Sequence, residues 1–252
     1  MSTLALLLRD PAEIARRCRE EDGLEPIAKA SLAALALGAA VFGGVVGSFR
    51  GGEQIAFAAL KIPLALLAAL GVSVPAFHAV AAVLGRARTL RSTVALSLAA
   101  SGRAALVLLA FAPALWLAYD RGLGYHAAAL AAALAYAVAG LAALSVLVRG
   151  LGEGAHRLTT TAAYVAIFLA ASAQTGWLLR PYLVRPRSEE VPLWRAREGG
   201  VGDALYRSSR SSVGLYDRVL DTGAGAWPCP ERSCGDAERD PACPCVDGEV
   251  WP

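Results

Sequence analysis

The sequence predicts an all-α protein, a polytopic transmembrane bundle of about five helices followed by an irregular tail that contains cysteines. Hydrophobic residues make up 56% of the chain and charged residues 18%, whereas globular domains have about 45–50% and about 25%. Between residues 31 and 180 the charges fall in short clusters, separated by apolar runs of roughly 20 residues. A helix of that length spans the hydrocarbon core of a bilayer. A soluble bundle would need polar stripes at the helical period, and segments 31–49 and 127–148 have none.

Residues 1–29 form an amphipathic N-terminal segment, which we assign to the cytoplasmic side. Asp10 and Pro11 are typical of a helix start, because proline is tolerated in a first turn. A short basic helix would follow. It would either lie in the membrane interface near anionic headgroups or lead as a solvated helix into the first span. Cys18 lies on this helix and is expected to remain a free thiol.

The transmembrane part is expected to cover residues 30–180. In the first span Ala39, Gly43 and Gly47 recur every four residues, a pattern of small residues that lets two helix backbones approach closely. Packing within the protein's own bundle is favoured over homodimerisation. The expected spans are residues 31–49, 55–85, 99–119, 127–148 and 158–179.

The second span contains the residues that could line a transport path. Pro63 and Pro75 each remove an intrahelical hydrogen bond, so this segment is predicted to be kinked or broken. Lys61 lies near its first end, from which the side chain can snorkel to the headgroups. His78 lies deeper and is a functional candidate, although a histidine without a carboxylate partner is more often a hydrogen-bonded packing residue.

Interfacial anchors are predicted at the ends of the later spans. One basic residue, Arg103, is expected about one turn inside the third span, on the side of a basic loop at residues 86–91. Tyr119 and a nearby tryptophan would form an aromatic belt at the far end of that span. The predicted anchors are Arg103, Trp116, Trp177 and Arg180.

The distribution of charge predicts the orientation and the location. Residues 181–252 carry nine arginines against twelve acidic residues, a net charge of −3. Because the whole chain has a net charge of +3, residues 1–180 carry +6. Because the excess lies in the membrane part, it indicates topology and not binding to nucleic acid. Lysine and arginine favour loops on the N-terminal side, which predicts a cytoplasmic N-terminus in the cell (inner) membrane. An odd number of spans then places the tail outside.

The tail at residues 181–252 is rich in Gly, Ser, Arg and Pro and is expected to be extramembrane and irregular. Its four cysteines follow the spacing C-x4-C-x8-C-x-C. Two disulfides would staple such a small segment in an oxidising compartment, with three possible pairings. A zinc site is the less favoured alternative, because structural zinc ligands usually come in C-x2–4-C pairs. The cysteines are Cys229, Cys234, Cys243 and Cys245.

Motifs for catalysis and cofactor binding are absent from the sequence. It contains no P-loop, no dinucleotide fingerprint, no H-E-x-x-H and no G-x-S-x-G. His78, His126 and His156 are widely separated, and no acidic residue lies inside an expected span. We therefore predict neither an enzyme nor a cofactor. Proton-coupled transport, which commonly uses an intramembrane carboxylate, is disfavoured for the same reason.

The second span also carries a family resemblance. The order of features is Ala59-Leu60-Lys61-Ile62-Pro63-Leu64, an apolar run, Val74-Pro75-Ala76-Phe77 and a closing Leu84-Gly85. This order resembles the second membrane segment of Yip1-like proteins, and the span count and orientation over residues 30–180 are also similar to that family. The cysteine-containing tail departs from the family's short C-terminus. The resemblance implies a non-enzymatic membrane adaptor that acts through helix packing and protein partners.

Two functional hypotheses follow from these patterns. The first is a non-catalytic membrane scaffold or accessory subunit of a larger assembly, which contacts the lipid bilayer and protein partners. The second is a small transporter or channel-like permease that uses Lys61, His78 and the segment between Pro63 and Pro75. The bias toward Ala, Arg and Gly indicates a bacterial source with a GC-rich genome.

Overall fold

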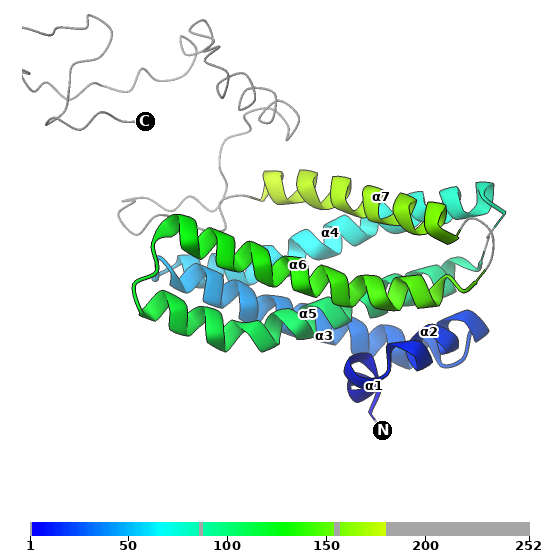
Figure 1. Ribbon diagram of the computed structural model, residues 1–252, viewed down its shortest axis with the longest axis horizontal. Helices are drawn as coiled ribbons and strands as arrows, with labels where there is room; N and C mark the ends of the chain where they lie inside the picture. Colours follow the sequence, from blue (N-terminus) through cyan, green and yellow to red (C-terminus); the bar gives the residue numbers. More distant parts are fainter. Residues whose placement is uncertain (1, 86–87, 154–156, 180–252) are drawn as a thin grey trace, which may run out of the picture. The chain divides into compact units, whose positions relative to one another are not determined.

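The computed structural model describes residues 2–85, 88–153 and 157–179, which form seven helices and no strand (Figure 1). Two short helices precede five long ones. The helices are α1 (Thr3–Arg9), α2 (Pro11–Glu20), α3 (Leu24–Ser48), α4 (Gln54–Val83), α5 (Leu90–Asp120), α6 (Tyr125–Gly150) and α7 (Arg157–Leu178). The all-helical prediction is confirmed for the described part of the chain.

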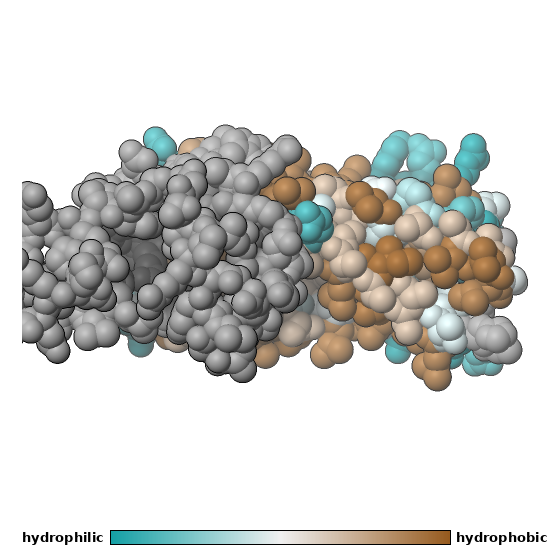
Figure 2. Space-filling view, turned by 90° about the horizontal axis from the view of Figure 1, so that it is seen from above, coloured by the Kyte–Doolittle hydropathy of each residue, from teal (hydrophilic) through white to brown (hydrophobic). Residues whose placement is uncertain are grey.

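Four of these helices, α3 to α6, are long and apolar enough to cross a membrane, with mean hydropathies of 1.9 to 2.2. Large apolar side chains also cover much of their outer surface, as expected where acyl chains replace water. Figure 2 shows hydrophobic side chains over much of the part of one face that is not drawn in grey, with hydrophilic side chains among them toward the right-hand end. The most exposed of these apolar side chains include Leu37, Val72, Leu130, Leu134 and Leu141. The chain is therefore a multi-pass membrane protein.

Two helices begin earlier than their apolar runs predict. α3 starts at Leu24, where an exposed ion pair between Lys29 and Glu25 (2.6 Å) supports its first turns. α5 starts at Leu90, because the side chain of Thr89 accepts a hydrogen bond from the backbone N–H of Ser92 at 3.2 Å and caps the helix. The first turn of α5 therefore includes residues that were expected in the basic loop.

α4 runs without interruption through both of its prolines. The expectation of a broken second segment is therefore wrong for this helix. Each proline removes only one intrahelical hydrogen bond, and a membrane helix tolerates that loss where neighbouring helices pack around it. Pro63 is itself buried in the bundle.

α3 packs closely on both α4 and α5. Glycines make the close approach possible. A Cβ atom added at Gly43 would lie 2.5 Å from the carbonyl oxygen of Ala58 on α4, and one at Gly38 would lie 2.6 Å from that of Ala105 on α5. Gly47 meets the backbone of α4 in the same way, and Ala39 is fully buried. The repeated small residues of the first span thus face neighbouring helices of the same chain.

The N-terminal helices are part of the bundle. Leu7, Ile14 and Cys18 are fully buried in one cluster with side chains from α4, α5, α6 and α7. The hydroxyl of Ser92 on α5 donates a hydrogen bond of 2.6 Å to the carbonyl oxygen of Cys18. The apolar face of α2 is therefore covered by protein, whereas the sequence predicted a helix on the lipid surface or in solvent.

Candidate functional site

An apolar cleft of about 880 Å³ lies between α6 and α7. These two helices are consecutive, but α7 packs mainly on α4 and touches α6 little. The ring of Tyr164 on α7 makes an edge-to-face contact with Phe77 of α4, with ring centres 4.6 Å apart. Because α7 is held by α4, one side of α6 is left open. We call this space the α6–α7 cleft.

The walls of the α6–α7 cleft are built from small and apolar side chains. On α6 the lining is dominated by alanine and glycine, and α5 contributes leucine and alanine. Few polar groups reach it. The hydroxyl of Ser172 is buried without a hydrogen-bond partner, and that of Thr175 donates to the carbonyl oxygen of Ala171 at 2.8 Å. The small residues of α6 in the lining include Ala129, Ala132, Ala133, Ala137 and Gly140.

Of the candidate transport residues of α4, Lys61 and His78 lie outside this lining, whereas Ala65 and Leu66, between Pro63 and Pro75, belong to it. Lys61 is only 2% exposed, and its Nζ lies 6.0 Å from the centre of the Phe57 ring. The expectation that Lys61 snorkels to the headgroups is therefore wrong, because the side chain is enclosed by the bundle. His78 is half-buried, and its Nδ1 lies 3.4 Å from the hydroxyl of Thr93 on α5. This contact is that of a packing residue joining two helices.

Arg103 lies much deeper in its helix than the sequence indicates. Because α5 begins at Leu90, Arg103 is roughly 20 Å from the helix start at 1.5 Å per residue. Its Nη1 donates a hydrogen bond of 3.0 Å to the carbonyl oxygen of Leu7, at the buried side of α1. Arg103 thereby ties α1 to the bundle, and its role as an interfacial anchor stays a prediction.

The two aromatic residues of the predicted belt on α5 lie in different environments. Trp116 is 52% exposed on the outer surface, as an interfacial residue would be. Tyr119 is buried, contrary to the prediction, and its hydroxyl donates to the carbonyl oxygen of Ala128 at 3.4 Å. The ring of Phe49 packs edge-on against it at 5.2 Å.

Several predicted residues fall outside the part of the chain that the structure describes. They include the side chain of one tryptophan in α7 and the whole of the tail. The choice between disulfides and zinc in the tail therefore stays a prediction. The residues concerned are Trp177, Arg180, Cys229, Cys234, Cys243 and Cys245. Within the described ranges, no three His, Cys, Asp or Glu side chains gather closely enough to hold a metal ion.

Comparison with protein-family models, with curated proteins and with solved structures gives no match.

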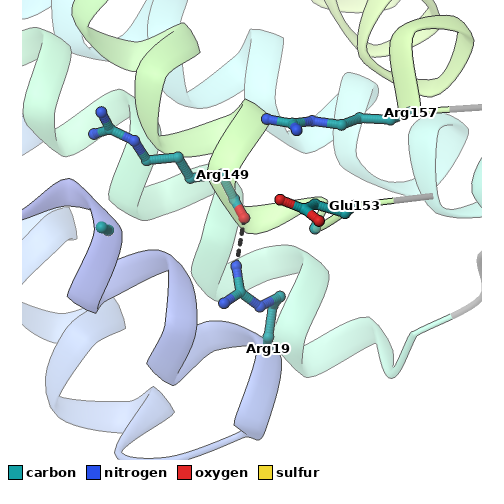
Figure 3. A pocket seen from close by; sticks show the side chains of 6 residues that line it. Arg19, Arg149, Glu153 and Arg157 are labelled. Atoms are coloured by element: carbon teal, nitrogen blue, oxygen red, sulfur yellow. Dashed lines mark hydrogen bonds between the residues drawn. The ribbon is translucent and has the colours of Figure 1, made fainter.

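A second concavity, of about 470 Å³, lies where α6 ends and α7 begins (Figure 3). We call this concavity the arginine pocket. Its lining residues are Ala12, Arg19, Arg149, Gly152, Glu153 and Arg157. From the sequence, its arginines indicate only topology, because their position around one concavity depends on how α2 folds back onto α6.

Arginines from distant segments cap the end of α6 beside the arginine pocket. The Nη1 of Arg19 donates a hydrogen bond of 2.5 Å to the carbonyl oxygen of Arg149, as drawn in Figure 3. The Nη2 of Arg88 donates one of 3.1 Å to the carbonyl oxygen of Leu151. The last carbonyls of a helix lack intrahelical partners and carry partial negative charge, so guanidinium groups stabilise them. The backbone of this turn is thereby fixed by α2 and by the segment before α5.

The outer face of α2 carries its own charge network. Glu13 accepts hydrogen bonds from Arg16 at 2.8 Å and from Arg17 at 2.7 Å. Bonding to Arg16, with Arg17 second, lowers the pKa of Glu13 to about 2, and the same carboxylate raises the pKa of Arg16. On the inner face, burial raises the pKa of the Cys18 thiol to about 11. Arg16 and Arg17 are thus already paired with a carboxylate of their own helix.

Proposed function

We propose that the protein is a non-enzymatic membrane scaffold or accessory subunit, which receives a transmembrane helix of a partner protein in the α6–α7 cleft. The observation that carries this proposal is a face of α6 lined with alanine and glycine and not covered by α7. The proposal matches the adaptor role that the resemblance to Yip1-like proteins implies.

Small residues already mediate close helix packing within this bundle. In α3, small residues occur where the backbones of α4 and α5 come within contact distance. Helices in a membrane gain little from burying apolar surface, and associate mainly through van der Waals contact between closely packed backbones. The same residue types on α6 meet open space, and a Cβ atom added at Gly140 would have no neighbour within 4 Å. This face therefore has the composition of a helix-packing surface without a helix on it.

The proposed topology completes this assignment. We take α7 as a fifth span, so that an N-terminus in the cytoplasm of a bacterial cell places the cysteine-containing tail outside the inner membrane. Disulfides among the tail cysteines would form there, and the tail would provide a second contact with the partner. The permease alternative has less support, because His78 contacts Thr93 and does not line the cleft.

Ala137→Trp tests the cleft directly. Ala137 is exposed and lines the cleft, so the indole fills the space without disturbing the core. Leu134→Trp is the matched control, because Leu134 is on the same helix, is exposed and does not line the cleft. We expect the wild-type protein and the Leu134→Trp variant to co-purify in mild detergent with one partner membrane protein, and the Ala137→Trp variant to lose it.

Photo-crosslinking then identifies what occupies the cleft. A benzoylphenylalanine at position 133 should form an adduct whose mapped peptide lies in a transmembrane segment of another protein. Adducts only with a second copy of this chain, or recovery of a partner-free protein that is stable in mild detergent, would count against the proposed function.

A further inference from the structure

The arginine pocket is lined by three arginines from separate parts of the chain. Arg19 comes from α2, Arg149 from the last turn of α6 and Arg157 from the first turn of α7. Arg19 is held in place by its hydrogen bond to the carbonyl oxygen of Arg149, and Figure 3 shows the side chains of Glu153 and Arg157 near that carbonyl, whereas the Arg149 side chain extends away from them. Their positions are therefore set by the fold and not by sequence proximity.

The charges around the arginine pocket do not balance. Among the described residues that line it, Glu153 is the single acidic one, against three arginines. By contrast, Arg16 on the outer face of α2 is paired with two carboxylates, those of Glu13 and Glu20. An anion in the pocket would offset the excess of positive charge among these described residues.

The arginine pocket lies at the membrane edge of the bundle. The apolar span in α6 ends at Gly150, and Leu158, next to Arg157, is 85% exposed. An exposed leucine beside an arginine is typical of the boundary between acyl chains and headgroups. Tyr164, which lines the α6–α7 cleft, lies two turns after Arg157 on the same face of α7, roughly 10 Å along the helix. A headgroup at the pocket would thus have apolar surface within reach of its acyl chains.

We propose that the arginine pocket binds the phosphate of an anionic phospholipid. The planar guanidinium group presents two parallel N–H donors to a phosphate, and basic pockets between helices at a membrane surface suit anionic headgroups. A phospholipid is favoured over a soluble phosphate because the pocket adjoins exposed apolar side chains. Binding also links α2, α6 and α7, so the lipid acts as a clamp on this end of the bundle.

The test compares lipids on the purified full-length protein in a zwitterionic detergent. Short-chain phosphatidylglycerol, short-chain phosphatidylcholine and inorganic phosphate are added separately, and binding is measured by native mass spectrometry and by the shift in unfolding temperature. We expect phosphatidylglycerol to bind and stabilise the protein, and the other two probes to have little effect. Equal binding of phosphatidylcholine would overturn the proposal, and so would equal stabilisation by inorganic phosphate.

Two variants locate the site. Arg157→Gln should weaken phosphatidylglycerol binding by about tenfold, because it loses one charge-assisted contact, and Arg149→Gln should weaken it by less, because it removes a positive charge beside the pocket. Arg149→Gln keeps the backbone carbonyl that accepts from Arg19, so the fold is preserved. Arg121→Gln is the matched control, since it removes one exposed arginine from the turn after α5. Unchanged binding in both pocket variants, or an equal loss in the control, would show that the site lies elsewhere. These outcomes do not depend on the partner helix of the α6–α7 cleft.

Discussion

The two faces of this bundle use the same small residues in opposite ways. Around α3, glycines bring α4 and α5 so close that a single methyl group would meet backbone atoms. Along α6, alanines and a glycine line a cleft of about 880 Å³. Small residues in a membrane helix thus indicate where backbones can approach, and only the structure shows whether the approaching helix belongs to the same chain.

The largest effect on stability is expected at Gly43, where α3 packs directly against the backbone of α4. Gly43→Leu would place a side chain against the backbone of Ala58 on α4, and overpacking of this kind costs about 3 kcal/mol at the upper end of its usual range. We expect poor recovery of folded protein and a lower unfolding temperature in detergent. Gly140→Leu, in the α6–α7 cleft, should leave both unchanged. Equal destabilisation by the two variants would remove the distinction between the two faces.

A smaller effect is expected at the junction of α1 with the bundle. Arg103→Met removes the hydrogen bond from Nη1 to the carbonyl oxygen of Leu7, which is worth about 2 kcal/mol for a charged donor. Hydrogen exchange should then increase in α1 but not in the contact between α3 and α4. Arg9→Met removes a charge from α1 itself and should leave the exchange unchanged. Slow exchange of α1 in the Arg103→Met variant would show that apolar packing alone holds it.

The thiol of Cys18 reports on whether α2 stays docked. Because its pKa is raised to about 11 and it is fully buried, only about one thiol in a thousand is ionised at pH 8. Alkylation of the peptide that contains Cys18, followed by mass spectrometry, should be slow in the folded protein and fast after denaturation. Alkylation at the rate of a free thiol would mean that α2 leaves the bundle on the timescale of labelling.

The smallest effect concerns pH. The pKa of Glu13 is lowered from 4.5 to about 2, so its bonds to Arg16 and Arg17 contribute stability above pH 4.5 and lose it as the pH falls toward 2. Because the pair is exposed, the contribution is small. In Glu13→Gln, the unfolding temperature should fall slightly at pH 7 and should match that of the wild-type protein near pH 2. A difference that persists at pH 2 would indicate a role other than charge.

The long helices could be predicted because their cause lies in the sequence itself. Apolar runs long enough to cross a bilayer specify α3 to α6, and the spacing of Ala39, Gly43 and Gly47 indicates a face that can pack closely. Helix starts were less accurate. A cap such as Thr89 and a pair such as Glu25 with Lys29 extend helices into polar sequence, where hydropathy gives no signal.

The candidate sites could not be predicted, because they depend on contacts between distant segments. The amphipathic pattern of α2 shows that one face is apolar but does not say that α6 covers it. The position of Arg103 follows from an early start of α5, and the burial of Lys61 follows from how the bundle closes around α4. The α6–α7 cleft exists because α7 packs on α4, a choice that no local pattern encodes.

The hydrogen bond from Arg19 to the end of α6 has a consequence for the order of synthesis. Its two residues are 130 positions apart, so α2 is made long before its packing partner exists. At roughly 5–20 residues per second, that interval lasts on the order of ten seconds. During this time α3 and α5 can already contact the N-terminal helices, but the α6 surface that α2 packs against does not yet exist. The N-terminal helices therefore complete their packing only after α6 is made, although they leave the ribosome first.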